Sequence, residues 1–90
     1  MELLYEEHRI RAVDDDGTPM GEITFSPAGE GRVCFDHTYV DPRFEGRGVA
    51  GQMMAAAVDQ VRARGWKATA ACSYARAWLE KHPDQAAALK

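Results

Sequence analysis

Hydrophobic and polar residues alternate along the first half of the chain in short runs that turn-forming residues separate. A weak alternation covers residues 8–13, GEITFS at 21–26 alternates clearly, and RVCFDHTYV follows at 32–40. Between them lie DDDGTP (14–19) and PAGEG (27–31), whose Asp, Gly and Pro residues are typical of tight turns. A period of two residues indicates half-buried β-strands. The pattern therefore predicts three strands joined as an antiparallel meander.

The third of these runs divides its side chains between the two faces of a sheet, because successive residues of a strand point to opposite sides. The two predicted faces are Val33, Phe35, His37 and Tyr39 on one side, and Cys34, Asp36, Thr38 and Val40 on the other. His37 would then lie on a mostly apolar face. A histidine in that position is commonly a hydrogen-bonded core residue, which is one interpretation of His37.

The hydrophobic period changes after residue 42 from that of a strand to that of a helix. Apolar side chains recur at positions 50, 53, 54, 57, 58 and 61, and polar ones take the opposite face. Gly65 is a natural C-terminal stop. The spacing predicts an amphipathic helix that includes residues 50–61 and ends before Gly65.

The last third of the chain predicts one strand and one helix. WKATAA (66–71) is the only candidate for a fourth strand, although its alanines make it a poor strand former. Ser73 can cap a helix over residues 74–82, which Pro83 ends. The predicted order is β-β-β-α-β-α. We therefore expect an α+β fold in which helices cover an antiparallel meander.

Length, composition and charge restrict the function classes. A chain of 90 residues suffices for one hydrophobic core, so residues 1–90 are expected to form a single domain. The net charge of −3 offers no general attraction to nucleic acid. No apolar run approaches the roughly 20 residues that span a bilayer, and the N-terminus is acidic where a signal peptide is basic. We expect a cytoplasmic protein without nucleic-acid or membrane partners.

The two cysteines, Cys34 and Cys72, do not form a disulfide framework, and no CxxC spacing indicates a metal site. Free thiols in a reducing compartment are the simplest interpretation. No metal ligand set is therefore predicted.

The segment RFEGRGVAG (43–51) contains three glycines and two arginines and leads directly into the predicted helix. A helix N-terminus offers free amides and partial positive charge, so a glycine-bearing loop there can bind phosphate through the backbone alone. GRGVAG also fits the dinucleotide fingerprint GxGxxG, but the βαβ context and the acidic residue about 20 positions further on are missing. No Lys-Ser or Lys-Thr pair follows, which excludes a P-loop. The alternative is that the glycines only shape a turn.

The pattern Arg43-x-x-Gly46-x-Gly48 resembles the Q/R-x-x-G-x-G/A loop of the GNAT superfamily of acyl-CoA N-acyltransferases. The likeness is closer to the small stand-alone GNAT-like N-acetyltransferase domains over about residues 8–84, with HTYVDPRFEGRGVAGQMM and CSYARAWLEKHP as matching blocks. It implies a GNAT-like fold whose loop holds the pyrophosphate of acetyl-CoA or coenzyme A. The implied cofactor-binding residues are Arg43, Gly46, Arg47, Gly48, Val49, Ala50 and Gly51. For the two arginines, a solvated charged loop is the alternative.

Acetyl transfer from a thioester to an amine needs a neutral amine, N–H donors for the developing oxyanion and a proton for the departing thiolate. The resemblance makes His37 the candidate general base and Cys72 an active-site residue. Cys72 also falls where the last strand meets a helix start, which would lower its pKa, although a buried inert thiol is the alternative. Tyr74 is a second candidate proton donor by analogy with larger GNAT enzymes, with core packing as its alternative. Cys34 faces away and has no assigned role.

The resemblance thus predicts an N-acetyltransferase that moves an acetyl group from acetyl-CoA to an amine acceptor. Larger GNAT enzymes have helices between their first two strands that help to build the acceptor site, whereas a short turn stands at 14–19 here. The acceptor is therefore undefined, and an open cleft suits a protein lysine, a polyamine or a small amine. A non-catalytic module that binds CoA or another protein is the alternative function.

Overall fold

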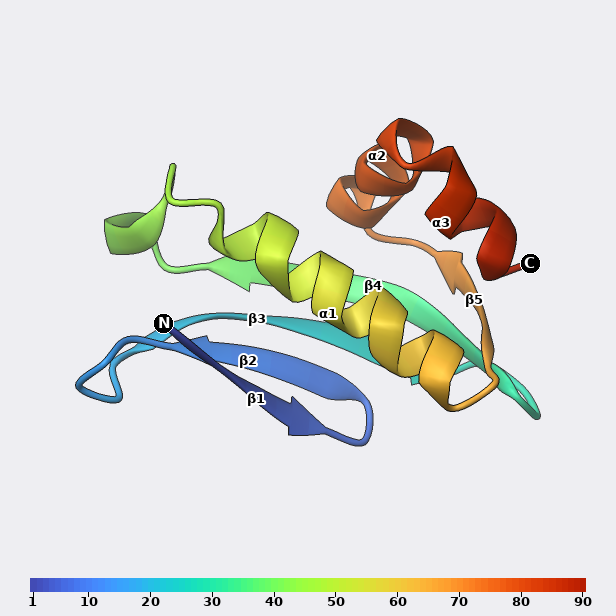
Figure 1. Cartoon of the computed structure of the whole chain (residues 1–90), viewed down its shortest axis with the longest axis horizontal. Coiled ribbons are helices and arrows are strands. Elements are labelled where there is room, and N and C mark those ends of the chain that lie inside the picture. Colours follow the sequence, from blue (N-terminus) through green and yellow to red (C-terminus); the bar gives the residue numbers. More distant parts are fainter.

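The computed structural model describes all 90 residues and contains one five-stranded sheet and three α-helices (Figure 1). The strands lie in the order β1-β2-β3-β4-β5; the first four are antiparallel, and β5 is parallel to β4. This mixed architecture confirms the predicted α+β class. The elements are β1 (Glu2–Glu6), β2 (Arg9–Val13), β3 (Pro19–Pro27), β4 (Arg32–Val40), the 3-10 helix η1 (Pro42–Phe44), α1 (Val49–Ala63), β5 (Lys67–Ala70), α2 (Ser73–Lys81) and α3 (Pro83–Ala88).

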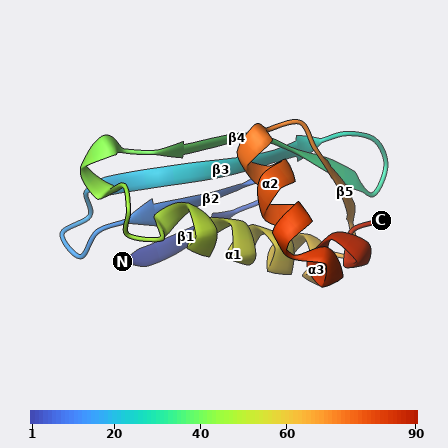
Figure 2. The ribbon, with the colours of Figure 1, turned by 90° about the horizontal axis from the view of Figure 1, so that it is seen from above.

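The three helices lie on one face of the sheet, and the other face is open (Figure 2). The core fills the layer between α1 and the sheet, and no polar or charged side chain is buried in it. The apolar stripe predicted for α1 is confirmed, because positions 53, 54, 57, 58 and 61 are all buried and position 50 is half-buried. No helix is both long and apolar enough to cross a lipid bilayer.

Two elements, β1 and α3, are absent from the sequence prediction. In β1, Leu3-Leu4-Tyr5 is a continuous apolar run rather than an alternation, and its strand form follows from pairing with β2. Pro83 does end α2, but it also occupies the first turn of α3, where its missing amide costs no hydrogen bond. The N-cap of α2 is Cys72 and not Ser73, so the helix starts one residue earlier than predicted.

The pairing of β3 with β4 contains a β-bulge. Thr24 pairs with His37 and Phe25 with Phe35, so Asp36 is an extra residue without a partner on β3. Such an insertion bends the strand and reverses the face on which every later residue lies.

Beyond the bulge, the two faces of β4 differ from those predicted by strict alternation. The helix-facing side chains are Val33, Phe35, Thr38 and Val40, and the open-face side chains are Cys34, Asp36, His37 and Tyr39. The predicted grouping of His37 and Tyr39 with Val33 and Phe35 is therefore wrong. His37 is not a core residue, since its side chain is 52% exposed.

The outer edge of β5 is closed by groups from the C-terminal part of the chain. The amide of Ala68 donates to the carbonyl of Leu89 at 2.9 Å. The Arg76 guanidinium donates to the carbonyls of Ala70 and Ala71, each at 3.2 Å. Because these edge groups are satisfied internally, they are not available for pairing with another strand.

Candidate functional site

The loop of residues 45–48, called the glycine loop below, is shaped by two glycines in the left-handed region. Gly46 has φ 79° and Gly48 has φ 75°, a conformation that residues with a side chain rarely adopt. A Cβ on Gly46 would meet no atom within 4 Å, and one on Gly48 would meet only the Gln52 side chain, at 4.0 Å. Backbone conformation, rather than crowding, therefore requires glycine here, and the space beside the loop is free for a ligand.

The first turn of α1 presents unpaired amides beside this loop. Gly48 is the N-cap, and its carbonyl accepts the first helical hydrogen bond from Gln52 at 3.1 Å. The amides of Val49, Ala50 and Gly51 therefore have no acceptor within the helix. No acidic residue stands in this turn and no side chain caps it, although Glu45 of the glycine loop lines the cavity beside it. The arrangement suits a phosphate group.

The two arginines of the segment differ in their availability. Arg43 donates from Nε to Asp41 Oδ1 and from Nη2 to Asp41 Oδ2, both at 3.1 Å, and its presence lowers the pKa of Asp41. Arg47 has no carboxylate partner, and its guanidinium carbon lies 5.3 Å from the centre of the Phe44 ring. Arg47 is therefore free to contact an anion, whereas Arg43 is held by Asp41.

A cavity of about 220 Å³ lies against the start of α1. Its walls join β4, the glycine loop and α2. The phenol oxygen of Tyr74 lies 3.8 Å from the position that a Cβ on Gly51 would take, so a side chain at residue 51 would narrow the space. The lining residues are Val40, Phe44, Glu45, Gly46, Gly48, Val49, Ala50, Gly51 and Tyr74.

Cys72 is held between β4 and the start of α2. Its backbone amide donates to the carbonyl of Phe35 at 3.1 Å, and its sulfur lies 3.5 Å from the Thr38 hydroxyl. Partial burial raises the pKa of the thiol, but the Thr38 hydroxyl and the backbone amides of Ala75, Tyr74 and Thr38 lower it, and the net result is a pKa below the ordinary value. The amides of α2 act here as dipoles, because the sulfur completes no capping hydrogen bond. A larger fraction of Cys72 is therefore thiolate than for an ordinary cysteine at the same pH.

Tyr74 stands two residues further along α2 and lines the cavity. Burial raises the pKa of its phenol above the ordinary value. The group therefore keeps its proton throughout the neutral range. A neutral phenol at this position can donate a proton but cannot serve as a base at neutral pH.

The strands β4 and β5 separate beside this site. Their pairing ends at Phe35 and Ala70, while β4 continues to Val40 paired with β3 only. The amide of Asp41 donates to Met20 on β3, and because strand amides alternate in direction, those of Thr38 and Val40 point to the side that β5 has left. The opening between the strands therefore carries backbone N–H donors.

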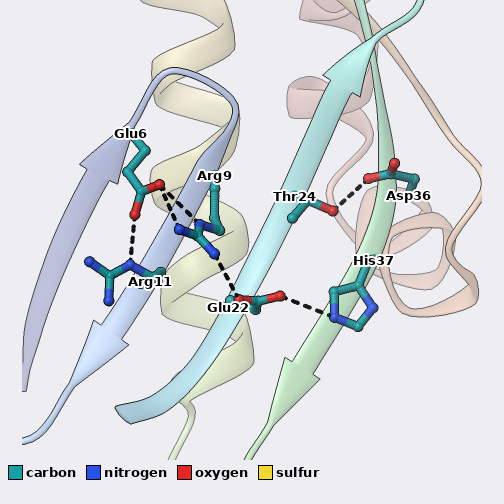
Figure 3. A network of polar contacts seen from close by, with 7 residues as sticks. All are labelled: Glu6, Arg9, Arg11, Glu22, Thr24, Asp36 and His37. Atoms are coloured by element: carbon teal, nitrogen blue, oxygen red, sulfur yellow. Dashed lines mark hydrogen bonds and ion pairs between the residues drawn. The ribbon is translucent and has the colours of Figure 1, made fainter. Parts of the chain in front are cut away.

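His37 lies on the open face of the sheet, away from α1 (Figure 3). Its Nε2 is 3.4 Å from Oε2 of Glu22, whose Oε1 in turn accepts from Arg9 at 3.4 Å. Glu6 and Arg11 extend this network across β1 and β2. The carboxylate of Glu22 can therefore orient the imidazole.

The structure thus brings Tyr74 and the glycine loop together at one cavity. Cys72 lies on the same side of the sheet, against Thr38 and two residues before Tyr74, but it does not line that cavity. His37 is separated from all of them by the thickness of the sheet. Thr38, and not His37, contacts Cys72. Sequence reasoning missed Thr38 because strict alternation turned it away from the helices. The signal that could have indicated a bulge is the polar stretch Asp36-His37-Thr38 inside an otherwise apolar strand.

A larger hollow of about 440 Å³ lies elsewhere, between β5, α2 and α3. It is lined by Ala70, Arg76, Leu79, Glu80, Pro83, Ala86, Ala87 and Lys90. It contains neither a long helix N-terminus nor any of the predicted site residues, and Arg76 is bound to backbone carbonyls. The smaller cavity at the glycine loop is therefore the better candidate site.

Comparison with known proteins identifies related sequences and folds. The sequence model of a family described as GCN5-related N-acetyl-transferase matches residues 9–89. A GCN5-like protein from Staphylococcus aureus, solved by NMR, is 30% identical and superposes with a TM-score of 0.74 over 93% of this chain and 82% of that chain. No match was found among the curated proteins.

Two larger structures share the fold at lower identity. Ard1 from Thermoplasma volcanium is 20% identical, with a TM-score of 0.69 over 84% of this chain and 54% of that chain. Tetrahymena GCN5 is 16% identical, with a TM-score of 0.63 over 84% of this chain and 51% of that chain. This chain therefore spans about half the length of these two proteins, and at such identity the likeness concerns the fold alone.

Proposed function

The chain belongs to the GCN5-related N-acetyltransferase family, and on this premise we propose that it transfers the acetyl group of acetyl-CoA to an amine in the cleft between the glycine loop, β4 and the start of α2. One observation carries the proposal. A helix start with free amides and a polarised thiol lie along the same stretch of β4, whose edge towards β5 is unpaired. Neither feature is needed for packing alone.

Acetyl-CoA supplies an activated thioester and carries a pyrophosphate by which the enzyme holds it. The amides of Val49, Ala50 and Gly51 would bind the pyrophosphate, with Arg47 as a further cationic contact. Gly46 and Gly48 keep the backbone free of side chains on that side. The cavity lined by Val40 and Tyr74 adjoins these amides and would receive the pantetheine arm.

The opening between β4 and β5 suits the thioester carbonyl. The amide of Thr38 points into this opening and can donate to the carbonyl oxygen as negative charge develops on it. The amide of Val40 lies two residues further along β4, beside the cavity. It can donate a hydrogen bond to the pantetheine arm, as it would to a neighbouring strand. Backbone donors fixed by the sheet need no reorganisation during the reaction.

Two proton movements accompany the transfer. The amine nitrogen attacks the carbonyl carbon, the C–S bond breaks, and the thiolate that leaves takes up a proton. Tyr74 is the neutral donor nearest the cavity, and its raised pKa keeps that proton available. Cys72 acts either as an acetyl carrier or as a group that orients the thioester, and its lowered pKa suits both roles.

His37 is the proposed base for the amine, and its position requires the amine to arrive from the open face of the sheet. The edge of β4 beyond Phe35 is not paired with β5, so an amine from the open side and a thioester from the helix side would meet at this edge. Glu22 holds the imidazole in place. No element covers this face, which leaves room for a protein lysine, a polyamine or a small amine as acceptor.

The binding part of this proposal is tested by titrating acetyl-CoA into ¹⁵N-labelled protein. We expect amide chemical-shift changes at residues 38–40, 46–51 and 72–74. Changes confined to residues 76–90, around the larger hollow, would contradict the proposed cleft. Product analysis with an amine then separates an enzyme from a module that only binds CoA.

A further inference from the structure

Asp36 is the extra residue of the β-bulge in β4, and the bulge decides which side chains reach Cys72. With the bulge, Ile23 pairs with Thr38, and the Thr38 hydroxyl lies 3.5 Å from the Cys72 sulfur. Without it, Ile23 would pair with His37, and Thr38 would turn to the open face. A shift of one residue therefore removes the contact between Thr38 and Cys72.

Hydrophobicity alone does not select the observed register. After Phe35, the bulged form turns Thr38 and Val40 towards the helices, and the regular form would turn His37 and Tyr39 there. Each choice places one polar and one largely apolar side chain on the inner face. A further interaction must therefore decide between them.

The carboxylate of Asp36 provides this interaction. Its Oδ1 accepts from the Thr24 hydroxyl at 2.6 Å and its Oδ2 from the Ser26 hydroxyl at 2.7 Å. Thr24 and Ser26 are two residues apart on β3, so a single carboxylate spans the position at which the register shifts (Figure 3 shows the contact with Thr24). Without the bulge, Asp36 would pair directly with Thr24. Its carboxylate would then no longer be placed between the Thr24 and Ser26 hydroxyls by the strand geometry.

We propose that Asp36 is a positioning residue that fixes the bulged register and thereby holds the Thr38 hydroxyl against the Cys72 sulfur. Its side chain lies on the open face and touches neither Cys72 nor the cavity. The effect on acetyl transfer rests on the proposed function, whereas the effect on register and on the thiol does not. The claim can therefore be tested without acetyl-CoA.

The register is tested directly by NMR on Asp36→Ala. In the parent, Ile23 and Thr38 form a non-hydrogen-bonded pair, so their α-protons should give a strong cross-strand NOE. We expect this NOE to weaken in Asp36→Ala and a new one between Ile23 and His37 to appear. Asp36→Asn can still accept from Thr24 and donate to Ser26, and it should keep the parental NOE.

The thiol provides a second readout, which a loss of stability alone would not move. The rate of Cys72 alkylation with iodoacetamide is measured against pH in the folded protein. In Asp36→Ala the midpoint of this pH profile should move to higher pH by up to one unit. Below the midpoint, a shift of one unit means about tenfold less thiolate at a given pH. Glu6→Gln is the matched control, because Glu6 lies on the same open face and bonds only Arg9 and Arg11. It should leave the profile unchanged.

If Asp36→Ala does not fold, the double substitution Thr24→Val with Ser26→Ala takes its place, since it removes both donors and keeps the carboxylate. Loss of the NOE between Ile23 and Thr38, with a shifted Cys72 profile, supports the proposal. An unchanged NOE and an unchanged profile in either folded variant overturns it. Absence of acetyl transfer in the parent would contradict the proposed function but would leave both readouts in place.

Discussion

The hydroxyl of Thr38 lies 3.5 Å from the sulfur of Cys72, although 34 residues separate the two along the chain. The contact joins β4, beyond the point where its pairing with β5 ends, to the start of α2. In the neutral form the thiol donates to the Thr38 oxygen, and a thiolate would instead accept from the hydroxyl. The contact therefore places the Cys72 thiol, at the start of α2, beside the edge of β4 that is proposed to bind the thioester.

We expect iodoacetamide to alkylate Cys72 faster than Cys34 at neutral pH. Both thiols are half-buried, so exposure alone does not separate them. The pKa of Cys72 is lowered by its hydrogen bond to Thr38 and by the amides of α2, so a larger fraction is thiolate. Its rate should therefore level off at a lower pH than that of an ordinary thiol. Peptide mapping measures both rates in one sample.

Thr38→Val is the matched variant for this experiment, because valine keeps the shape of threonine and removes the hydroxyl. Labelling of Cys72 should slow several-fold in this variant, and labelling of Cys34 should not change. CoA should protect Cys72 alone. Equal rates for the two cysteines, insensitive to CoA, would remove Cys72 from the site.

Gly48→Val should abolish the stabilisation of the protein by acetyl-CoA. A ligand at 100 times its dissociation constant stabilises the fold by about 2.7 kcal/mol, which raises the melting temperature of a domain of this size by roughly ten degrees or more. Gly17→Val is the control, since Gly17 also has a positive φ of 87° and open surroundings but lies in the β2–β3 turn. Both variants should lose similar intrinsic stability, and only Gly48→Val should lose the shift. An equal shift in both would show that the glycine loop does not bind the ligand.

Arg47→Ala should weaken acetyl-CoA binding more than Arg43→Ala. A hydrogen bond to a charged group contributes about 1.5–3 kcal/mol, and at the lower end its loss raises Kd about tenfold. Arg43 is already bound to Asp41, so its removal should chiefly loosen η1. Isothermal titration calorimetry at low salt measures both constants. A larger loss for Arg43→Ala would mean that Arg43 leaves Asp41 to bind the ligand.

His37→Ala should lower kcat with an amine acceptor by about 100-fold and leave the Kd for acetyl-CoA nearly unchanged. This test separates a catalytic role from a structural one, because removal of a side chain that is 52% exposed should not unfold the protein. Circular dichroism and steady-state kinetics on one preparation measure both properties. A folded variant with parental kcat would exclude His37 as the base.

The site elements that sequence reasoning located are those fixed by local chemistry. The glycine loop and α1 follow from backbone rules that act within a few residues: left-handed glycines, an N-terminus without carboxylates and an apolar stripe of helical period. The placement of Cys72 at a helix start is local in the same sense. Only the identity of the N-cap was wrong, by one residue.

The faces of β4 could not be predicted because they depend on contacts between strands. The bulge exists only relative to β3, and the groups that hold it, Asp36 with Thr24 and Ser26, are at least 10 residues apart in sequence. The alternation of residues along one strand cannot reveal that this strand has an extra residue relative to the strand beside it. The error placed His37 with the core and hid the contact between Thr38 and Cys72.

The central claim is most directly tested by the products formed from acetyl-CoA and a panel of amines: a lysine-containing peptide, a polyamine and a small primary amine. Mass spectrometry would follow the acetylated amine and free CoA together over time. We predict that the parent and Gly17→Val produce both in equal amounts with at least one amine, and that Gly48→Val produces neither. A parent protein that binds acetyl-CoA in the cleft but acetylates none of the amines, or a Gly48→Val variant as active as the parent, would contradict the proposed function.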